Sequence, residues 1–126
     1  MFVLIIGSAP DALEAQSFNR ELFQQVVAIN NAWNVRSDWD YCIFPDDFPG
    51  NRRPNENDEQ RLIGSEQYVP LQNKYGGFVY SGGTMAFTAG YWVLGHFNPR
   101  AIAYIGCDMV YDEKHPIFME EATQIL

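Results

Sequence analysis

The chain has 126 residues, a net charge of −8 and 47% apolar residues. This length suits one domain with its own core, and the apolar share excludes a chain that is mainly disordered. The excess of acids argues against a nucleic-acid-binding protein, and no apolar run is long enough to span a membrane. The two cysteines form no CxxC motif or Cys/His cluster. We therefore expect no zinc site, no disulfide framework and a cytoplasmic location.

The first part of the chain predicts three strands and one helix. Residues 2–6 are a continuous apolar run, which is typical of a strand buried on both faces of a parallel sheet. Apolar residues at helical spacing then predict a helix from residue 10 to about residue 25. Shorter apolar runs predict strands at residues 26–29 and 39–44.

Residues 45–60 are predicted to form a long loop. Three prolines and a glycine within residues 45–54 exclude a helix or a strand there. We expect this loop to be poorly ordered or to lie over the binding site. Arg52 and Arg53 have two open interpretations, a phosphate clamp or a solvated pair. The adjacent Asp46 and Asp47 indicate a polar turn more than a metal site, so no metal is expected.

The second part of the chain predicts a helix at residues 84–96, a strand at 101–105 and a short final helix near 118–125. The order of elements indicates one domain over residues 1–126. We expect an α/β fold, a three-layer α/β/α Rossmann-like domain with a mostly parallel sheet. The helix at 84–96 carries more apolar surface than one sheet face covers, which favours a homo-oligomer.

Small and polar residues follow every predicted strand, at Gly7, Ser8, Asn30, Ser81 and Asp108 among others. Ligands of open parallel sheets bind beyond the carboxyl ends of the strands, so these residues predict one ligand site. The alternative is that they are ordinary turn residues. The pattern differs from a nicotinamide site, which needs G-x-G-x-x-G, and from a phosphate-binding G-x-x-x-x-G-K-[ST] loop.

The segment Ser81-Gly82-Gly83-Thr84 is the strongest local signal, because two glycines precede a predicted helix. The glycines let a ligand approach the backbone, and the free N–H groups of a helix N-terminus suit a carboxylate or a phosphate. A simple Ser or Thr helix cap is the alternative interpretation. His115 lies near Tyr111 and two acids, an arrangement that permits acid–base chemistry but is also common on protein surfaces.

Four short motifs occur in order along the chain: I-G-S-A-P at 6–10, A-I-N-N at 28–31, Y-S-G-G-T at 80–84 and I-A-Y-I-G-C-D at 102–108. Together they resemble those of the bacterial family-42 sialyltransferases. They also resemble the wider group that includes archaeal-type hydroxymethylpterin pyrophosphokinase-like proteins. The resemblance implies a glycosyltransferase-like domain that binds a nucleotide-sugar donor of the CMP-sialic-acid type. Transfer to an unknown acceptor would need no metal and no cofactor.

The resemblance also implies roles for individual residues. Gly7, Ser8 and Pro10 would form the nucleotide turn, and Asn30 would contact the donor. Ser81 and Gly82 would hold the sialic acid carboxylate, and Asp108 would match the acid of the family's G-x-D motif. Tyr111 is the nearest counterpart of the family's tyrosine, and His115 is nominated as the base by proximity alone.

The chain departs from the family after Asp108, where few residues remain for the lid that carries a second tyrosine and the histidine. This departure predicts a fragment, or a reduced relative that binds without transfer. Two other functions therefore stay open. One is a pterin or nucleotide pyrophosphokinase, and the other is a non-catalytic nucleotide-binding or interaction module.

Overall fold

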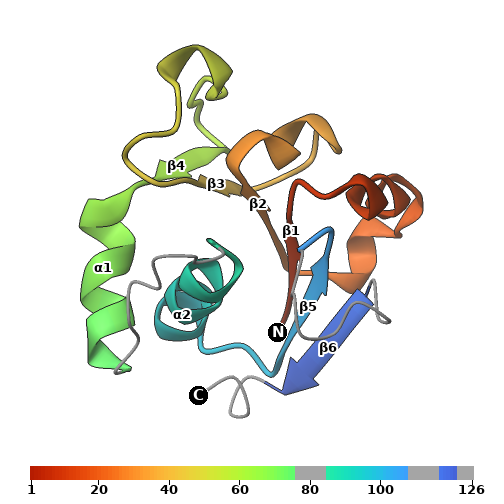
Figure 1. The fold of residues 1–126 in the computed structure, drawn as a ribbon. Helices are drawn as coiled ribbons and strands as arrows, with labels where there is room; N and C mark the ends of the chain where they lie inside the picture. The colour runs from red at the N-terminus through yellow and green to blue at the C-terminus, as the bar shows by residue number, and fades with distance from the viewer. Residues whose placement is uncertain (76–84, 108–116, 122–126) are drawn as a thin grey trace.

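The computed structural model describes residues 1–75, 85–107 and 117–121 (Figure 1). Its centre is a six-stranded sheet in the order β4-β3-β2-β1-β5-β6. The strands are β1 (Phe2–Ile6), β2 (Gln25–Ile29), β3 (Tyr41–Ile43), β4 (Arg61–Ile63), β5 (Ala101–Ile105) and β6 (Ile117–Glu121). The first five run parallel, and β6 pairs antiparallel with β5. The predicted single α/β domain with a mostly parallel sheet is confirmed.

The central strand β1 is buried on both faces, which explains its unbroken apolar sequence. Val3 and Ile5 pack into the core cluster on one side of the sheet, whereas Leu4 and Ile6 pack into the cluster on the other side. Successive side chains of a strand point to opposite faces, so both faces need apolar residues here. β1 is also where the chain order reverses, because β2, β3 and β4 extend to one side and β5 returns on the other.

Different kinds of helix cover the two faces of the sheet. The α-helices α1 (Ser65–Lys74) and α2 (Met85–Phe97) lie on one side (Figure 1). The other side carries the 3₁₀ helices η1 (Pro10–Ser17), η2 (Arg20–Leu22) and η3 (Asn30–Asn34). A fourth, η4 (Gly50–Arg52), lies in the loop before β4. Helices were expected on both faces of the sheet. Within the described part of the chain, only one face carries α-helices, and the other carries 3₁₀ helices.

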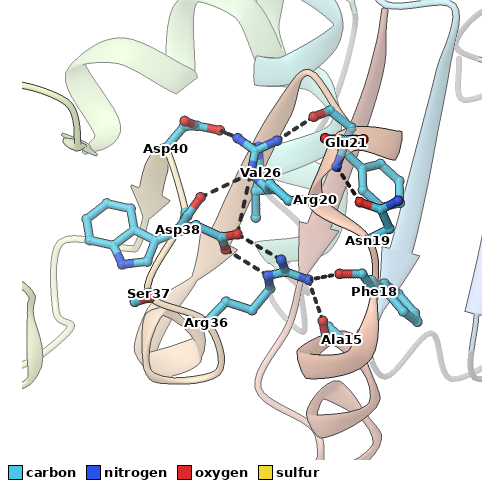
Figure 2. Close-up of polar contacts among 12 residues, drawn as sticks. Ala15, Phe18, Asn19, Arg20, Glu21, Val26, Arg36, Ser37, Asp38 and Asp40 are labelled. Carbon is cyan, nitrogen blue, oxygen red and sulfur yellow. Dashed lines mark hydrogen bonds and ion pairs between the residues drawn. The ribbon is translucent and has the colours of Figure 1, made fainter.

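The single helix predicted from residue 10 to about residue 25 is wrong, because this segment forms η1 and η2. The carbonyl oxygens of Ala15 and Phe18 each accept a hydrogen bond from the Arg36 guanidinium, both at 2.7 Å (Figure 2). These carbonyls are then held by a side chain from a distant segment. The Asn19 side chain accepts the N–H of Glu21 and starts the second helix. Side-chain hydrogen bonds thus hold the end of η1 and the start of η2.

Helix α2 confirms the predicted helix to within a residue at each end. Most of its apolar surface is covered where it packs on the sheet and against α1, whereas Phe87, Tyr91 and Phe97 are half-buried. The sequence analysis missed α1, which has a proline at position 70, and the three-residue strand β4. Gly95 faces α1, because a Cβ there would lie 2.7 Å from a methyl carbon of Leu71. The homo-oligomer expected from the apolar surface of this helix stays a prediction.

One further expectation is corrected. The helix predicted near residues 118–125 is wrong at its start, because residues 117–121 form β6 and pair with β5.

The loop at 46–60 has internal contacts and one contact to the sheet through Arg53. The Arg53 guanidinium donates to the carbonyl oxygen of Phe48 inside the loop, and it lies 4.3 Å from the centre of the Phe44 ring, which directly follows β3. Arg53 therefore anchors the loop, and Phe48 is buried.

Candidate functional site

A cleft of about 480 Å³ opens at the carboxyl ends of β1, β2, β3 and β5. It lies where the order of strands reverses, which is the place where open α/β sheets bind ligands. Its volume falls within the ~300–1,000 Å³ range of small-molecule sites. Its lining residues are Gly7, Ser8, Ala9, Pro10, Ile29, Asn30, Pro45, Met85, Ala86, Gly106 and Cys107.

The structure thus brings together four of the residues predicted for the site: Gly7, Ser8, Pro10 and Asn30. The other seven predicted residues lie outside the described part of the chain, namely Ser81, Gly82, Gly83, Thr84, Asp108, Tyr111 and His115. Pro45 and Cys107 also line the cleft. They follow predicted strands, as Gly7 and Asn30 do, so the sequence places them at the same edge of the sheet, although they are not among the residues predicted to bind the ligand.

The floor of the cleft is a close approach of two backbone turns. The N–H of Gly7 donates to the carbonyl oxygen of Ile105 at 2.8 Å, and the N–H of Ala9 donates to that of Gly106 at 2.9 Å. A Cβ at residue 7 would lie 2.3 Å from the Gly106 carbonyl oxygen, so glycine is required there. Gly106 itself has a φ of +70°, a conformation that favours glycine. Both glycines are therefore needed to join the ends of β1 and β5.

Asn30 has two unusual features at the edge of the cleft. Its φ is +55°, which asparagine tolerates better than most residues. Its side-chain oxygen Oδ1 is buried and accepts no hydrogen bond from the described residues. A buried polar atom without a partner is costly, and it is explained when a ligand supplies the missing donor. Asn30 is therefore the residue of the cleft that most directly indicates a ligand.

The cleft has a neutral lining and a positive helix end. Among its described lining residues no side chain carries a charge. Met85 and Ala86 are the first residues of α2, whose first-turn N–H groups have no partner within the helix. The helix dipole adds partial positive charge there. An anionic group bound at this end would be held by backbone donors, since no basic side chain lines the described part of the cleft.

Cys42 supports Asn30 from the neighbouring strand. Its thiol donates to the carbonyl oxygen of Asn30 at 3.3 Å. Burial raises the pKa of the Cys42 thiol to about 12, and the Arg53 charge lowers it only in part. The thiol therefore stays protonated, and remains a donor, throughout the physiological pH range. Burial and the nearby Asp11 charge likewise raise the pKa of Cys107 to about 12.

We expect both thiols to be inert in the folded protein. At pH 8 the native protein should react with iodoacetamide far more slowly than the protein in urea, because the thiolate is the reactive form. The native rate should rise with pH towards 12, as the thiolate fraction grows. Intact-protein mass spectrometry over time measures both rates. Native alkylation of Cys107 at the rate of the unfolded chain would contradict its raised pKa.

The chain matches no protein-family model, no curated protein and no solved structure. Within the described residues, no helix is long and apolar enough to cross a membrane. The fold and the cleft define the class, a single α/β domain with a cleft at the carboxyl edge of a mostly parallel sheet.

Proposed function

We propose that the cleft binds a nucleotide-sugar donor of the CMP-sialic-acid type, and that the chain is a glycosyltransferase-like domain. The observation that carries the proposal is the buried Oδ1 of Asn30, which has no donor among the described residues and lies at the same cleft as the N-terminus of α2. One end of the site offers an acceptor and the other offers donors. A ligand that satisfies both has a hydroxyl or amino group and an anionic group.

A CMP-sugar has this combination of groups. Its amino and hydroxyl groups can donate to Asn30, and its phosphate or sugar carboxylate can accept from the first turn of α2. Close backbone approach at Gly7 suits a flat or extended ligand, because no side chain projects there. Ser81, Gly82, Gly83 and Thr84 immediately precede Met85 in the sequence, so they join this helix end in the proposal.

In the proposed reaction, His115 removes the proton from the acceptor hydroxyl, whose oxygen attacks the anomeric carbon of the sugar. The bond from that carbon to the CMP phosphate oxygen breaks, and Tyr111 donates a hydrogen bond to the departing phosphate. Asp108, which follows β5 in the sequence, matches the acid of the family's G-x-D motif in the proposal. Neither metal nor cofactor takes part. A pyrophosphokinase remains the alternative enzyme, and it would require Mg²⁺ to bridge ATP phosphates.

Nucleotide binding tests the proposal directly. We expect CMP to stabilise the protein in a thermal-shift panel of CMP, CDP, UDP, ATP and GTP, with the same shift in the presence and absence of Mg²⁺. Stabilisation by ATP that depends on Mg²⁺ would instead support the pyrophosphokinase. If no nucleotide binds saturably, the chain is a non-catalytic module and the proposal is wrong.

The variant Asn30→Asp tests the role of the amide. We expect it to weaken CMP binding by about tenfold or more, because the added negative charge repels the anionic ligand although an acceptor oxygen is kept. Aspartate tolerates the positive φ, so the fold should survive. Asn51→Asp is the matched control, since Asn51 is exposed in η4 and adds the same charge away from the cleft. Isothermal titration of both variants with CMP measures the difference; equal affinities would place the ligand elsewhere.

A further inference from the structure

A second cavity, of about 410 Å³, lies at the edge of the sheet on the side covered by α1 and α2. Its lining residues are Tyr41, Glu56, Arg61, Leu62, Ile63, Gln67, Leu71, Trp92 and His96. It borders Tyr41, the first residue of β3, whereas the cleft borders Pro45, beyond the end of that strand. At about 3.3 Å per residue these two positions are ~13 Å apart, so this edge groove is separate from the cleft.

Aromatic rings form one wall of the edge groove. His96 stacks on Trp92 with ring centres 4.8 Å apart and planes 15° apart. The Tyr41 ring meets Trp92 edge-on at 5.0 Å and lies 6.1 Å from His96. Trp92 is buried beneath these rings, while Tyr41 is half-buried and His96 is exposed. Such a rigid aromatic surface favours the packing of another flat ring.

Arg61 supplies the positive charge of the edge groove. It pairs with Tyr41 in the register of β3 and β4, so the two side chains lie on the same face of the sheet. Within the described part of the chain its guanidinium makes no hydrogen bond or ion pair. Arg36, by contrast, lines another cavity but is held by Asp38 and by backbone carbonyls.

Besides the rings of Tyr41 and His96, two other polar side chains line the edge groove, and each uses an acceptor oxygen within the chain. Glu56 accepts the N–H of Leu62 at 3.1 Å, and Gln67 accepts the N–H of Gly64 at 2.9 Å. The guanidinium of Arg61 is therefore the charged donor left for a ligand. A guanidinium binds carboxylates through two parallel hydrogen bonds, and it does so best beside an apolar surface that excludes water.

We propose that the edge groove binds a carboxylate carried on a flat ring, with the carboxylate on Arg61 and the ring against Tyr41 and His96. This site is independent of nucleotide binding, because none of its residues lines the cleft. It requires both halves of the ligand: the carboxylate for the ion pair and the ring for the aromatic wall.

Titration of the ¹⁵N-labelled full chain with benzoate tests this proposal. We expect saturable shifts of the Trp92 indole N–H and of the Arg61 side-chain signal, with acetate and benzyl alcohol each binding at least tenfold more weakly. The variant Arg61→Gln should weaken benzoate binding by about tenfold or more, since a charge-assisted hydrogen-bond pair is lost. Arg100→Gln is the matched control, because Arg100 is exposed and lies outside the groove.

Any of three results would contradict the proposed site. Benzoate could cause no saturable shift at Trp92, acetate could bind as tightly as benzoate, or Arg61→Gln and Arg100→Gln could lose the same benzoate affinity. CMP titration of Arg61→Gln separates this result from the proposed function. We expect unchanged CMP binding in that variant. The benzoate and CMP titrations therefore test the edge groove and the cleft separately.

Discussion

Replacing Gly7 by alanine is expected to lower the free energy of unfolding by at least about 3 kcal/mol. The new Cβ would lie 2.3 Å from the carbonyl oxygen of Gly106 and 2.9 Å from the Cα of Cys107. Both obstacles are backbone atoms, so no side-chain rotation relieves the clash. The strands β1 and β5 would have to separate at the floor of the cleft. Urea denaturation followed by circular dichroism measures the loss.

Two other glycines serve as controls for this variant. Gly50→Ala should change stability by less than about 1 kcal/mol, because nothing lies within 4 Å of the added Cβ. Gly95→Ala should also be mild, since the clash is with the flexible Leu71 side chain and alanine favours the helix by about 1 kcal/mol. A Gly7→Ala variant as stable as Gly50→Ala would contradict the backbone contact between β1 and β5.

Replacing Asp40 by alanine is expected to lower the free energy of unfolding by about 2–3 kcal/mol. Its carboxylate accepts the N–H of Val26 at 2.7 Å and pairs with Arg20 at 2.6 Å (Figure 2). Alanine would leave the Val26 N–H, at the start of the buried part of β2, without its acceptor. It would also leave the half-buried Arg20 without a carboxylate. Urea denaturation again measures the change.

The variant Asp40→Asn separates the hydrogen bond from the charge. Burial raises the pKa of the Asp40 carboxyl, although the Val26 N–H and Arg20 oppose the shift. Because the folded pKa lies above the unfolded one, the carboxyl favours folding most at low pH, and this contribution is lost as the pH rises through the folded pKa. The asparagine side chain is neutral and its oxygen can still accept the N–H of Val26. Asp40→Asn should therefore lower the free energy of unfolding by less than about 1 kcal/mol at pH 7. Equal losses in both variants would show that the charge matters more than the hydrogen bond.

The fold class and the edge of the sheet that carries the cleft were both predictable from the sequence. The unbroken apolar runs at β1, β2 and β5 indicate buried parallel strands, and the polar residues after them mark one edge. The placement of Gly7, Ser8, Pro10 and Asn30 around one cleft follows from that pattern. Their role in binding stays a prediction, as do the functions of the residues in the undescribed segments.

The helices were less predictable, because tertiary contacts decide them. The segment after β1 has helical spacing, yet it forms 3₁₀ helices, and Arg36 from a distant segment holds the carbonyls of Ala15 and Phe18 at the end of the first one. The helix α1 contains Pro70 and a polar composition, so local propensity argues against it. It is packed against α2, which supplies the apolar surface that α1 covers. Such packing outweighs propensity but leaves no local signal.

The sequence by itself therefore determined the buried strands β1, β2, β3 and β5 and the edge that carries the cleft, because burial on both faces demands apolar residues that are visible one strand at a time. Only the tertiary structure decided the edge strands β4 and β6, the Asn30 oxygen that has no partner among the described residues, the backbone contact at Gly7 and the aromatic wall beside Arg61. Each of these depends on atoms from segments far apart in the chain, and their distances are set by how the strands and helices pack together.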